Sequence, residues 1–199
     1  MRIVLTGATG RIGAYLREPL HARGWKVIPW SGSPGVEWGG TPAVAVDLAD
    51  ARTIVGELDR ASPDVIVHLA AISDAEAVRR DPDRARVVNV EAVATIAGWC
   101  ARNERRLVFT STDMVFPGTK ASSTEADEPG PILAYGESKR AAERAALEAP
   151  DSVVARICLL YGPTRNGRGT FFDQAVAQLR AGEPRTFFDD EFRTPLDYA

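Results

Sequence analysis

The stretch RIVLTGATGRIG, residues 2–13, decides the fold of this chain of 199 residues. A short apolar run, typical of a buried strand, leads directly into glycines at every third position. Such glycines allow a tight turn, a close approach of backbone amides to a pyrophosphate, and close packing of the next helix on the strand. The free amides and the positive end of that helix would face phosphate groups. The stretch therefore predicts a dinucleotide site, although a glycine-rich turn can also be a plain strand-helix connection. The cofactor-binding residues expected in this turn are Gly7, Thr9, Gly10, Arg11, Ile12 and Gly13.

Beyond this turn, short runs rich in Val and Ile alternate with longer segments of helical periodicity. The predicted strands are residues 2–5, 26–29, 44–46, 65–69, 107–110 and 153–157, and the predicted helices are 11–22, 51–59, 84–102, 134–148 and 171–180. Pro19 predicts a kink or an early end in the first helix, and residues 31–42 and 117–131 are expected to be loops. The alternation predicts an α/β fold, a Rossmann-type doubly wound parallel sheet with helices on both faces.

Composition excludes several classes of protein. With 45% hydrophobic and 26% charged residues, the chain is expected to form an ordinary globular core without a disulfide or metal staple. The net charge of -3 is spread along the chain without blocks, so neither nucleic acid nor an anionic membrane is an expected partner. Neither a signal peptide nor a membrane-length apolar run occurs, which favours a cytoplasmic location. Cys100 and Cys158 lie in apolar segments and are expected to be inert buried thiols.

The ends of the second and third predicted strands bear on the choice of cofactor. A carboxylate after the second strand would bind the free ribose hydroxyls of NAD. This strand runs instead into Ser31 and Ser33, whose hydroxyls could receive a 2′-phosphate, although no arginine sits there to hold it. NADP(H) is therefore favoured over NAD(H). Asp47 and Leu48 follow the third strand and could face the adenine, or Asp47 could simply cap the next helix.

The fourth predicted strand ends in small residues. Leu69, Ala70 and Ala71 would let the backbone lie against the cofactor, although tight packing alone would also explain them. His68, on the same apolar strand, is expected to be a buried histidine with its hydrogen bonds satisfied.

Tyr135 and Lys139 stand four residues apart on a predicted helix, so that their side chains share one face. A phenol is a poor acid-base catalyst at pH 7, and a neighbouring ammonium lowers its pKa by stabilising the phenolate. A hydroxyl at the end of the fifth strand, that of Thr112 or Ser111, could hold a substrate oxygen while Tyr135 transfers a proton. The competing interpretation is a surface Tyr-Lys pair, with Thr112 capping a turn.

Taken together, residues 6–13, STDMVFPG at 111–118 and YGESK at 135–139 resemble the extended short-chain dehydrogenase/reductase family. Within that family, the segment at 111–118 is most similar to the dTDP-4-dehydrorhamnose reductase branch. The resemblance implies that Thr112 orients the substrate, that Tyr135 donates the proton, and that Lys139 binds the nicotinamide ribose and tunes Tyr135. It also implies a nucleotide-sugar substrate, and it is compatible with a homodimer.

Two departures from the family pattern favour simple reduction. The dehydratases carry an Asp-Glu pair after the threonine, whereas this chain has Asp113 and Met114, and a thioether transfers no proton. The epimerases show an asparagine two residues before Tyr-Gly-Pro, whereas this chain has Leu159 before Tyr161. A 4-keto nucleotide-sugar reductase is therefore expected. The alternatives are an epimerase of the same family, or a non-catalytic NADP-binding subunit similar to the regulatory subunit of methionine adenosyltransferase.

The resemblance further divides the chain into two parts. Residues 1–162 are expected to form the NAD(P)-binding domain, and residues 163–199 a small, incomplete substrate-binding part. In the second part, Arg193 could contact a nucleotide diphosphate, and a plain surface arginine is the alternative.

Overall fold

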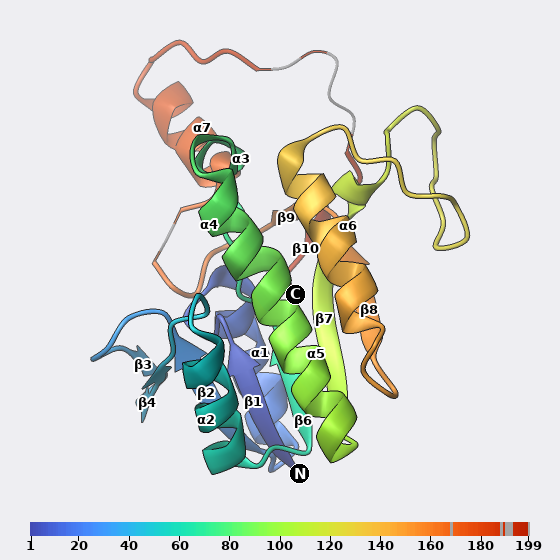
Figure 1. Ribbon diagram of the computed structural model, residues 1–199. Helices are drawn as coiled ribbons and strands as arrows, with labels where there is room; N and C mark the ends of the chain where they lie inside the picture. Colours follow the sequence, from blue (N-terminus) through green and yellow to red (C-terminus); the bar gives the residue numbers. More distant parts are fainter. Residues whose placement is uncertain (168, 188, 190–192, 199) are drawn as a thin grey trace.

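The computed structural model describes residues 1–167, 169–187, 189 and 193–198. At its centre lies a six-stranded sheet in which every pair is parallel, in the order β5-β2-β1-β6-β7-β8 (Figure 1). The strands are β1 Arg2–Thr6, β2 Lys26–Ser31, β5 Val44–Ala45, β6 Val65–His68, β7 Arg106–Thr112 and β8 Val153–Ile157. Counted along the chain, this order is third, second, first, fourth, fifth, sixth, which is the order of the Rossmann fold. The predicted fold class is confirmed.

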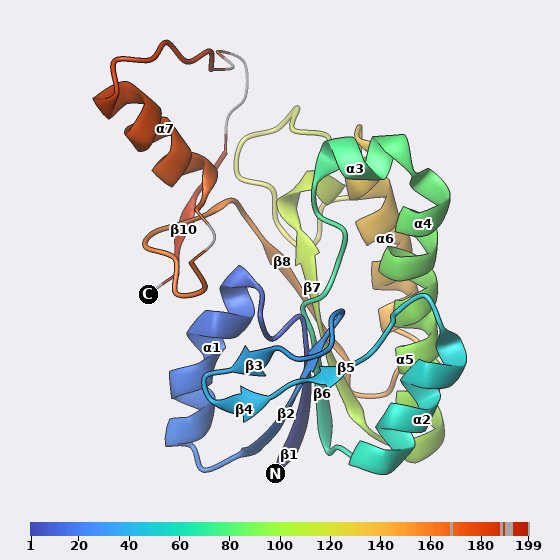
Figure 2. The same ribbon diagram turned by 90° about the vertical axis from the view of Figure 1, so that its left-hand side faces the viewer.

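Helices cover both faces of the sheet (Figure 2). One face carries α1 Arg11–Ala22, and the other carries α2 Ala51–Ala61, α5 Ala92–Asn103 and α6 Ala134–Ala146. The core is accordingly divided in two, because successive residues of a strand point to opposite faces. Val4 of β1 packs in the larger cluster, whereas Ile3 and Leu5 pack in the smaller one.

Several segments differ from the predicted elements. The expected helix 84–102 is α4 Pro82–Arg86, a π-helical turn Val87–Glu91 and α5 in succession, and the short helix α3 Ala75–Arg80 was not predicted. The early end at Pro19 is wrong, since α1 continues through Pro19 to Ala22; a proline in the last turn costs only one helical hydrogen bond. The expected loop 31–42 contains a small hairpin of β3 Glu37–Trp38 and β4 Thr41–Pro42.

The C-terminal segment returns to the carboxyl ends of the strands. Strand β10 Leu196–Asp197 pairs in parallel with β9 Leu160–Tyr161, and α7 Phe171–Arg180 lies beyond the end of the sheet (Figure 2). Residues 168, 188, 190–192 and 199 of the predicted C-terminal part lie outside the described residues. Among the helices that the structure describes, none is long and apolar enough to cross a membrane.

Candidate functional site

A cavity of about 250 Å³ opens at the carboxyl ends of β1, β2 and β6. In open α/β sheets, ligands bind at the carboxyl ends of the strands, at the point where the strand order changes direction. Here that point lies between β1 and β6. The residues that line the cavity are Thr6, Gly7, Thr9, Trp30, Ser31, Gly32, Val46, Asp47, Leu48, Ala70, Ala71, Ile72, Arg84 and Val88.

The glycine turn is crowded by backbone atoms. Gly7 has φ +64°, and a Cβ there would lie 2.9 Å from the backbone nitrogen of Ala70. A Cβ at Gly13 would lie 2.3 Å from the carbonyl oxygen of Ala8, so only glycine lets α1 pack this closely on the turn after β1. The glycines therefore bring backbone close together beside the cavity at the start of α1, which fits a pyrophosphate.

The structure brings about half of the predicted cofactor residues to the cavity. Those that line it are Gly7, Thr9, Ser31, Asp47, Leu48, Ala70 and Ala71. Those that do not line it are Gly10, Arg11, Ile12, Gly13, Ser33, Leu69, Tyr135 and Lys139.

Two of the alternatives at the strand ends are resolved by hydrogen bonds. Asp47 does not cap α2; its carboxylate accepts from the Ala49 amide, and Asp50 is the N-cap residue. The Ser31 hydroxyl donates to the Ser33 carbonyl oxygen at 2.5 Å, so the chain after β2 turns back on itself and carries Ser33 out of the cavity.

His68 and Thr6 join β6 to β1 beneath the cavity. The Thr6 hydroxyl oxygen accepts from the amides of Leu69 and Ala70 at 3.2 Å and lies 2.9 Å from His68 Nδ1. Burial lowers the pKa of His68 to about 3, so the ring is neutral. The expectation of a fully satisfied histidine is wrong in part, because Nε2 is buried and has no partner among the described residues.

Three cavity residues show what sequence reasoning missed. Thr6 and Trp30 stand at the ends of predicted strands, so the rule that ligands bind there could have found them. Arg84 could not be found in this way, because α4 brings it to the cavity from a distant part of the sequence.

Thr112, Tyr135 and Lys139 form a second group, outside the cavity lining. Thr112 ends β7, and its hydroxyl caps the 3₁₀ turn Asp113–Val115 by accepting from the Met114 amide at 3.2 Å. A Cβ at Gly136 would lie 2.3 Å from the Met114 carbonyl oxygen, so the helix that carries Tyr135 packs directly on this turn. The capping role of Thr112 is thus present, but the pair beside it is not on the surface: Tyr135 is half-buried and Lys139 is 3% exposed.

The ionisation of the pair differs from the simple expectation. The pKa of Tyr135 is raised, mainly by burial and further by the charge of Asp113, whereas the sequence predicted a lowered value. Burial lowers the pKa of Lys139 to about 7, against the opposing effect of Glu143. For both groups, burial outweighs the attraction expected between the ammonium and a phenolate.

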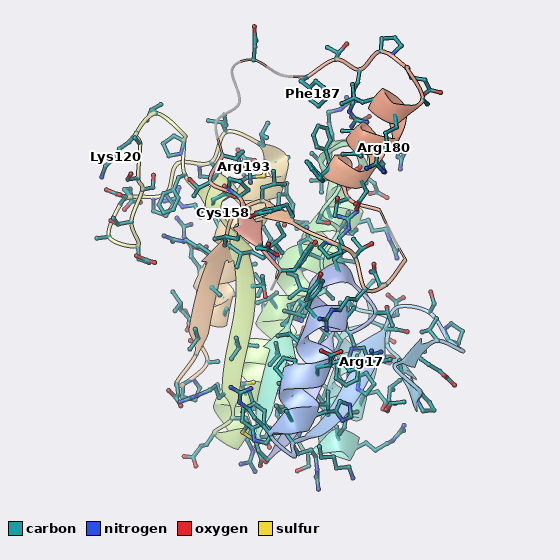
Figure 3. The ribbon with its side chains drawn as sticks, turned by 180° about the vertical axis from the view of Figure 1, so that it is seen from behind. Arg17, Lys120, Cys158, Arg180, Phe187 and Arg193 are labelled. Carbon is teal, nitrogen blue, oxygen red and sulfur yellow. The ribbon has the colours of Figure 1, made fainter. Side chains whose placement is uncertain are left out.

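The structure also distinguishes the two hydroxyl residues at the end of β7, Ser111 and Thr112. The Ser111 hydroxyl donates to Glu143 at 2.5 Å, which leaves Thr112 as the hydroxyl on the side of the 3₁₀ turn. Arg193 is not a plain surface residue, because its guanidinium holds both carboxylate oxygens of Asp113 at 2.7 and 2.9 Å. Figure 3 places Arg193 at the carboxyl ends of the strands, near Cys158.

Asn89 connects the two groups. Its side-chain oxygen accepts from the Ile72 amide at 2.8 Å, and its side-chain nitrogen donates to the Ile72 carbonyl and to the Ser138 hydroxyl. It lies in the π-helical turn before α5, a type of turn frequent at functional sites. Asn89 thus ties the cavity wall to the helix between Tyr135 and Lys139.

A six-stranded sheet of this order, with a glycine turn after its first strand and a buried Tyr-Lys helix, defines an NAD(P)-binding protein of the extended short-chain dehydrogenase/reductase class. Residues 1–198 match the family described as RmlD substrate binding domain, and the chain belongs to that family.

Three curated relatives show the breadth of the similarity. The chain is 32% identical to the probable low-salt glycan biosynthesis reductase Agl14 of Haloferax volcanii, over 98% of this chain and 66% of that protein. It is 31% identical to the dTDP-4-dehydrorhamnose reductase of Mycolicibacterium smegmatis (92% of this chain, 52% of that protein). It is 33% identical to methionine adenosyltransferase 2 subunit beta of Rattus norvegicus (81% and 47%). The chain therefore spans about half to two thirds of the length of these relatives.

Solved structures agree with the fold. The dTDP-4-dehydrorhamnose reductase of Bacillus anthracis in complex with NADP is 25% identical with a TM-score of 0.78, covering 90% of this chain and 60% of that one. MoeE5 in complex with UDP-glucose and NAD is 26% identical with a TM-score of 0.83, covering 100% of this chain and 68% of that one.

Proposed function

We propose that the chain is the cofactor-binding part of an NAD(P)H-dependent reductase of a 4-keto nucleotide sugar. The observation that carries the proposal is the packing of Gly136 on the Met114 carbonyl, which sets the Tyr135 helix against the turn capped by Thr112. The reductases among the relatives support the same activity. Residues 1–162 as the NAD(P)-binding domain, residues 163–199 as part of a substrate-binding region and a cytoplasmic location belong to this proposal.

The cavity fits a dinucleotide, because it joins a glycine turn whose backbone faces outward to the ends of β2 and β6. When bound, NADPH supplies a hydride. The Thr112 hydroxyl, now directed to Asp113 Oδ1 at 3.1 Å, would hold the substrate carbonyl oxygen. Tyr135 carries its proton at neutral pH because its pKa is raised, and it would donate that proton to the same oxygen. Lys139 in its charged form would stabilise the phenolate that remains.

The preference for NADP(H) is part of the proposal and is supported by Arg84. An arginine near the ribose can accommodate the 2′-phosphate, and Arg84 lines the cavity together with Ser31. Its guanidinium has no hydrogen-bond or ion-pair partner within the part of the chain that the structure describes.

Arg84→Gln is expected to weaken NADPH binding by about tenfold, the loss of one charge-assisted hydrogen bond, and to leave NADH binding unchanged. Isothermal titration of both cofactors measures the two affinities. Arg80→Gln, on α3 and outside the cavity lining, is the matched control. An equal loss for NADH and NADPH would assign Arg84 to folding and not to the 2′-phosphate.

A second candidate is a non-catalytic NADP-binding subunit. The similarity to methionine adenosyltransferase 2 subunit beta favours this candidate. The buried Lys139, on the same helix face as Tyr135, favours a catalytic protein instead. The test is a panel of 4-keto nucleotide sugars with purified protein, in which NADPH absorbance reports turnover. Oxidation of NADPH with a member of the panel supports the reductase. Binding of NADPH without oxidation, together with a co-purifying partner, would overturn it.

A further inference from the structure

Glu143 is a charged residue buried in the core side of α6. It is 4% exposed, and among the described residues its carboxylate accepts hydrogen bonds from Arg156 and Ser111. Arg156 of β8 donates from Nε to Oε1 at 2.9 Å and from Nη2 to Oε2 at 2.7 Å, and the Ser111 hydroxyl donates to Oε1 at 2.5 Å. This is a bidentate pair supported by a third hydrogen bond, the geometry that a buried carboxylate requires.

Lys139 stands one helical turn before Glu143, on the same face of α6. Its ammonium lies 4.2 Å from the centroid of the Phe109 ring, and it is 3% exposed. An ammonium in such a place loses most of its hydration, which favours the neutral amine. The negative charge of Glu143, one turn away, favours the charged ammonium instead.

We propose that Glu143 is a positioning residue for Lys139: with Arg156 it forms a pair whose net field determines whether the Lys139 side chain is charged. This inference rests on the proposed function only in the role that it gives to the charge, since a charged Lys139 would stabilise the phenolate of Tyr135.

Other charged groups near Lys139 do not replace Glu143. His68 of β6 is neutral, because its pKa lies at about 3. In the turn after β7, the charge of Asp113 raises the pKa of Tyr135, and Asp113 forms an ion pair with Arg193. On its own helix, Glu143 raises the pKa of Lys139, and burial lowers that pKa to about 7.

The two members of the pair should act in opposite directions. Loss of the Glu143 charge removes the attraction and leaves Arg156 as a nearby cation, so Lys139 should lose its proton at lower pH. Loss of the Arg156 charge leaves the Glu143 carboxylate unscreened, so Lys139 should keep its proton to higher pH. A purely structural role would destabilise the protein in both variants and would predict no opposed shift.

The experiment measures the pKa of Lys139 directly, by NMR titration of protein with labelled lysine. The chain has only three lysines, so the signals can be assigned by substitution of Lys26 and Lys120. We expect Glu143→Gln to lower the pKa of Lys139 by at least about one unit and Arg156→Gln to raise it. Glu137→Gln, the same change on the exposed side of α6, is the control and should leave the pKa unchanged.

A third variant guards against unfolding. Glu143→Gln with Arg156→Gln leaves neither member of the ion pair buried without its partner, so it should fold while the pKa of Lys139 still lies below that of Arg156→Gln. Shifts of the same sign in both single variants, or no shift in either, would overturn the proposal. Because the titration needs no cofactor or substrate, opposed shifts would support this inference even where NADPH is bound without oxidation and a partner co-purifies, the outcome that overturns the reductase. In an active protein, Glu143→Gln should also move the alkaline fall of turnover to lower pH.

Discussion

Tyr135→Phe is expected to lower turnover by at least about 10²-fold, the contribution typical of a positioned general acid. The substitution keeps the aromatic ring and removes only the hydroxyl. The hydroxyl is the group whose pKa is raised by burial and by Asp113, so that it holds its proton at neutral pH. Steady-state kinetics with NADPH and the substrate found in the panel measure the effect.

NADPH affinity should stay within about twofold in the same variant, because the substitution removes one hydroxyl and leaves the glycine turn and the cavity lining unchanged. Tyr161→Phe is the matched control: Tyr161 lies exposed in β9, and its substitution should leave both quantities unchanged. Wild-type turnover in Tyr135→Phe would remove Tyr135 from the mechanism.

Gly10→Val is expected to reduce NADPH binding by at least about 10²-fold. Gly10 is the N-cap residue of α1, and its amide donates to the Gly7 carbonyl at 2.9 Å. A Cβ at Gly10 would lie 2.9 Å from that carbonyl oxygen, and the branched methyl groups would have to occupy the space in front of the helix amides. A pyrophosphate needs that space. Calorimetric titration with NADPH measures the loss, and far-ultraviolet circular dichroism checks that the helices remain.

Gly56→Ala in α2 is the control for this variant. A Cβ at Gly56 meets no atom within 4 Å, so alanine should leave NADPH binding unchanged and stabilise the fold by about 0.5–1 kcal/mol through helix propensity. Wild-type affinity in Gly10→Val would contradict the assignment of the glycine turn as a phosphate site.

Much of the fold follows from local patterns in the sequence. The strands of the sheet and α1, α6 and α7 lie within a few residues of their predicted positions, because buried parallel strands need continuous apolar runs and surface helices need one apolar stripe. The segment 84–102 was predicted less well. The π-helical turn that divides it widens the helix where Asn89 bonds to Ile72 and Ser138, and these partners are brought there only by folding.

The sequence by itself predicted the strands and helices of the doubly wound sheet and the glycine turn at its first strand, because apolar periodicity and glycine spacing are readable within a few positions. It also proposed Thr112, Tyr135 and Lys139 as the catalytic group. Only the tertiary structure decided the rest. It placed Arg84 in the cavity although the end of β2 offers no arginine, and it directed the Ser111 hydroxyl to Glu143. It also set the pKa of Tyr135 upward and that of Lys139 downward, because desolvation depends on what the whole fold places around a side chain.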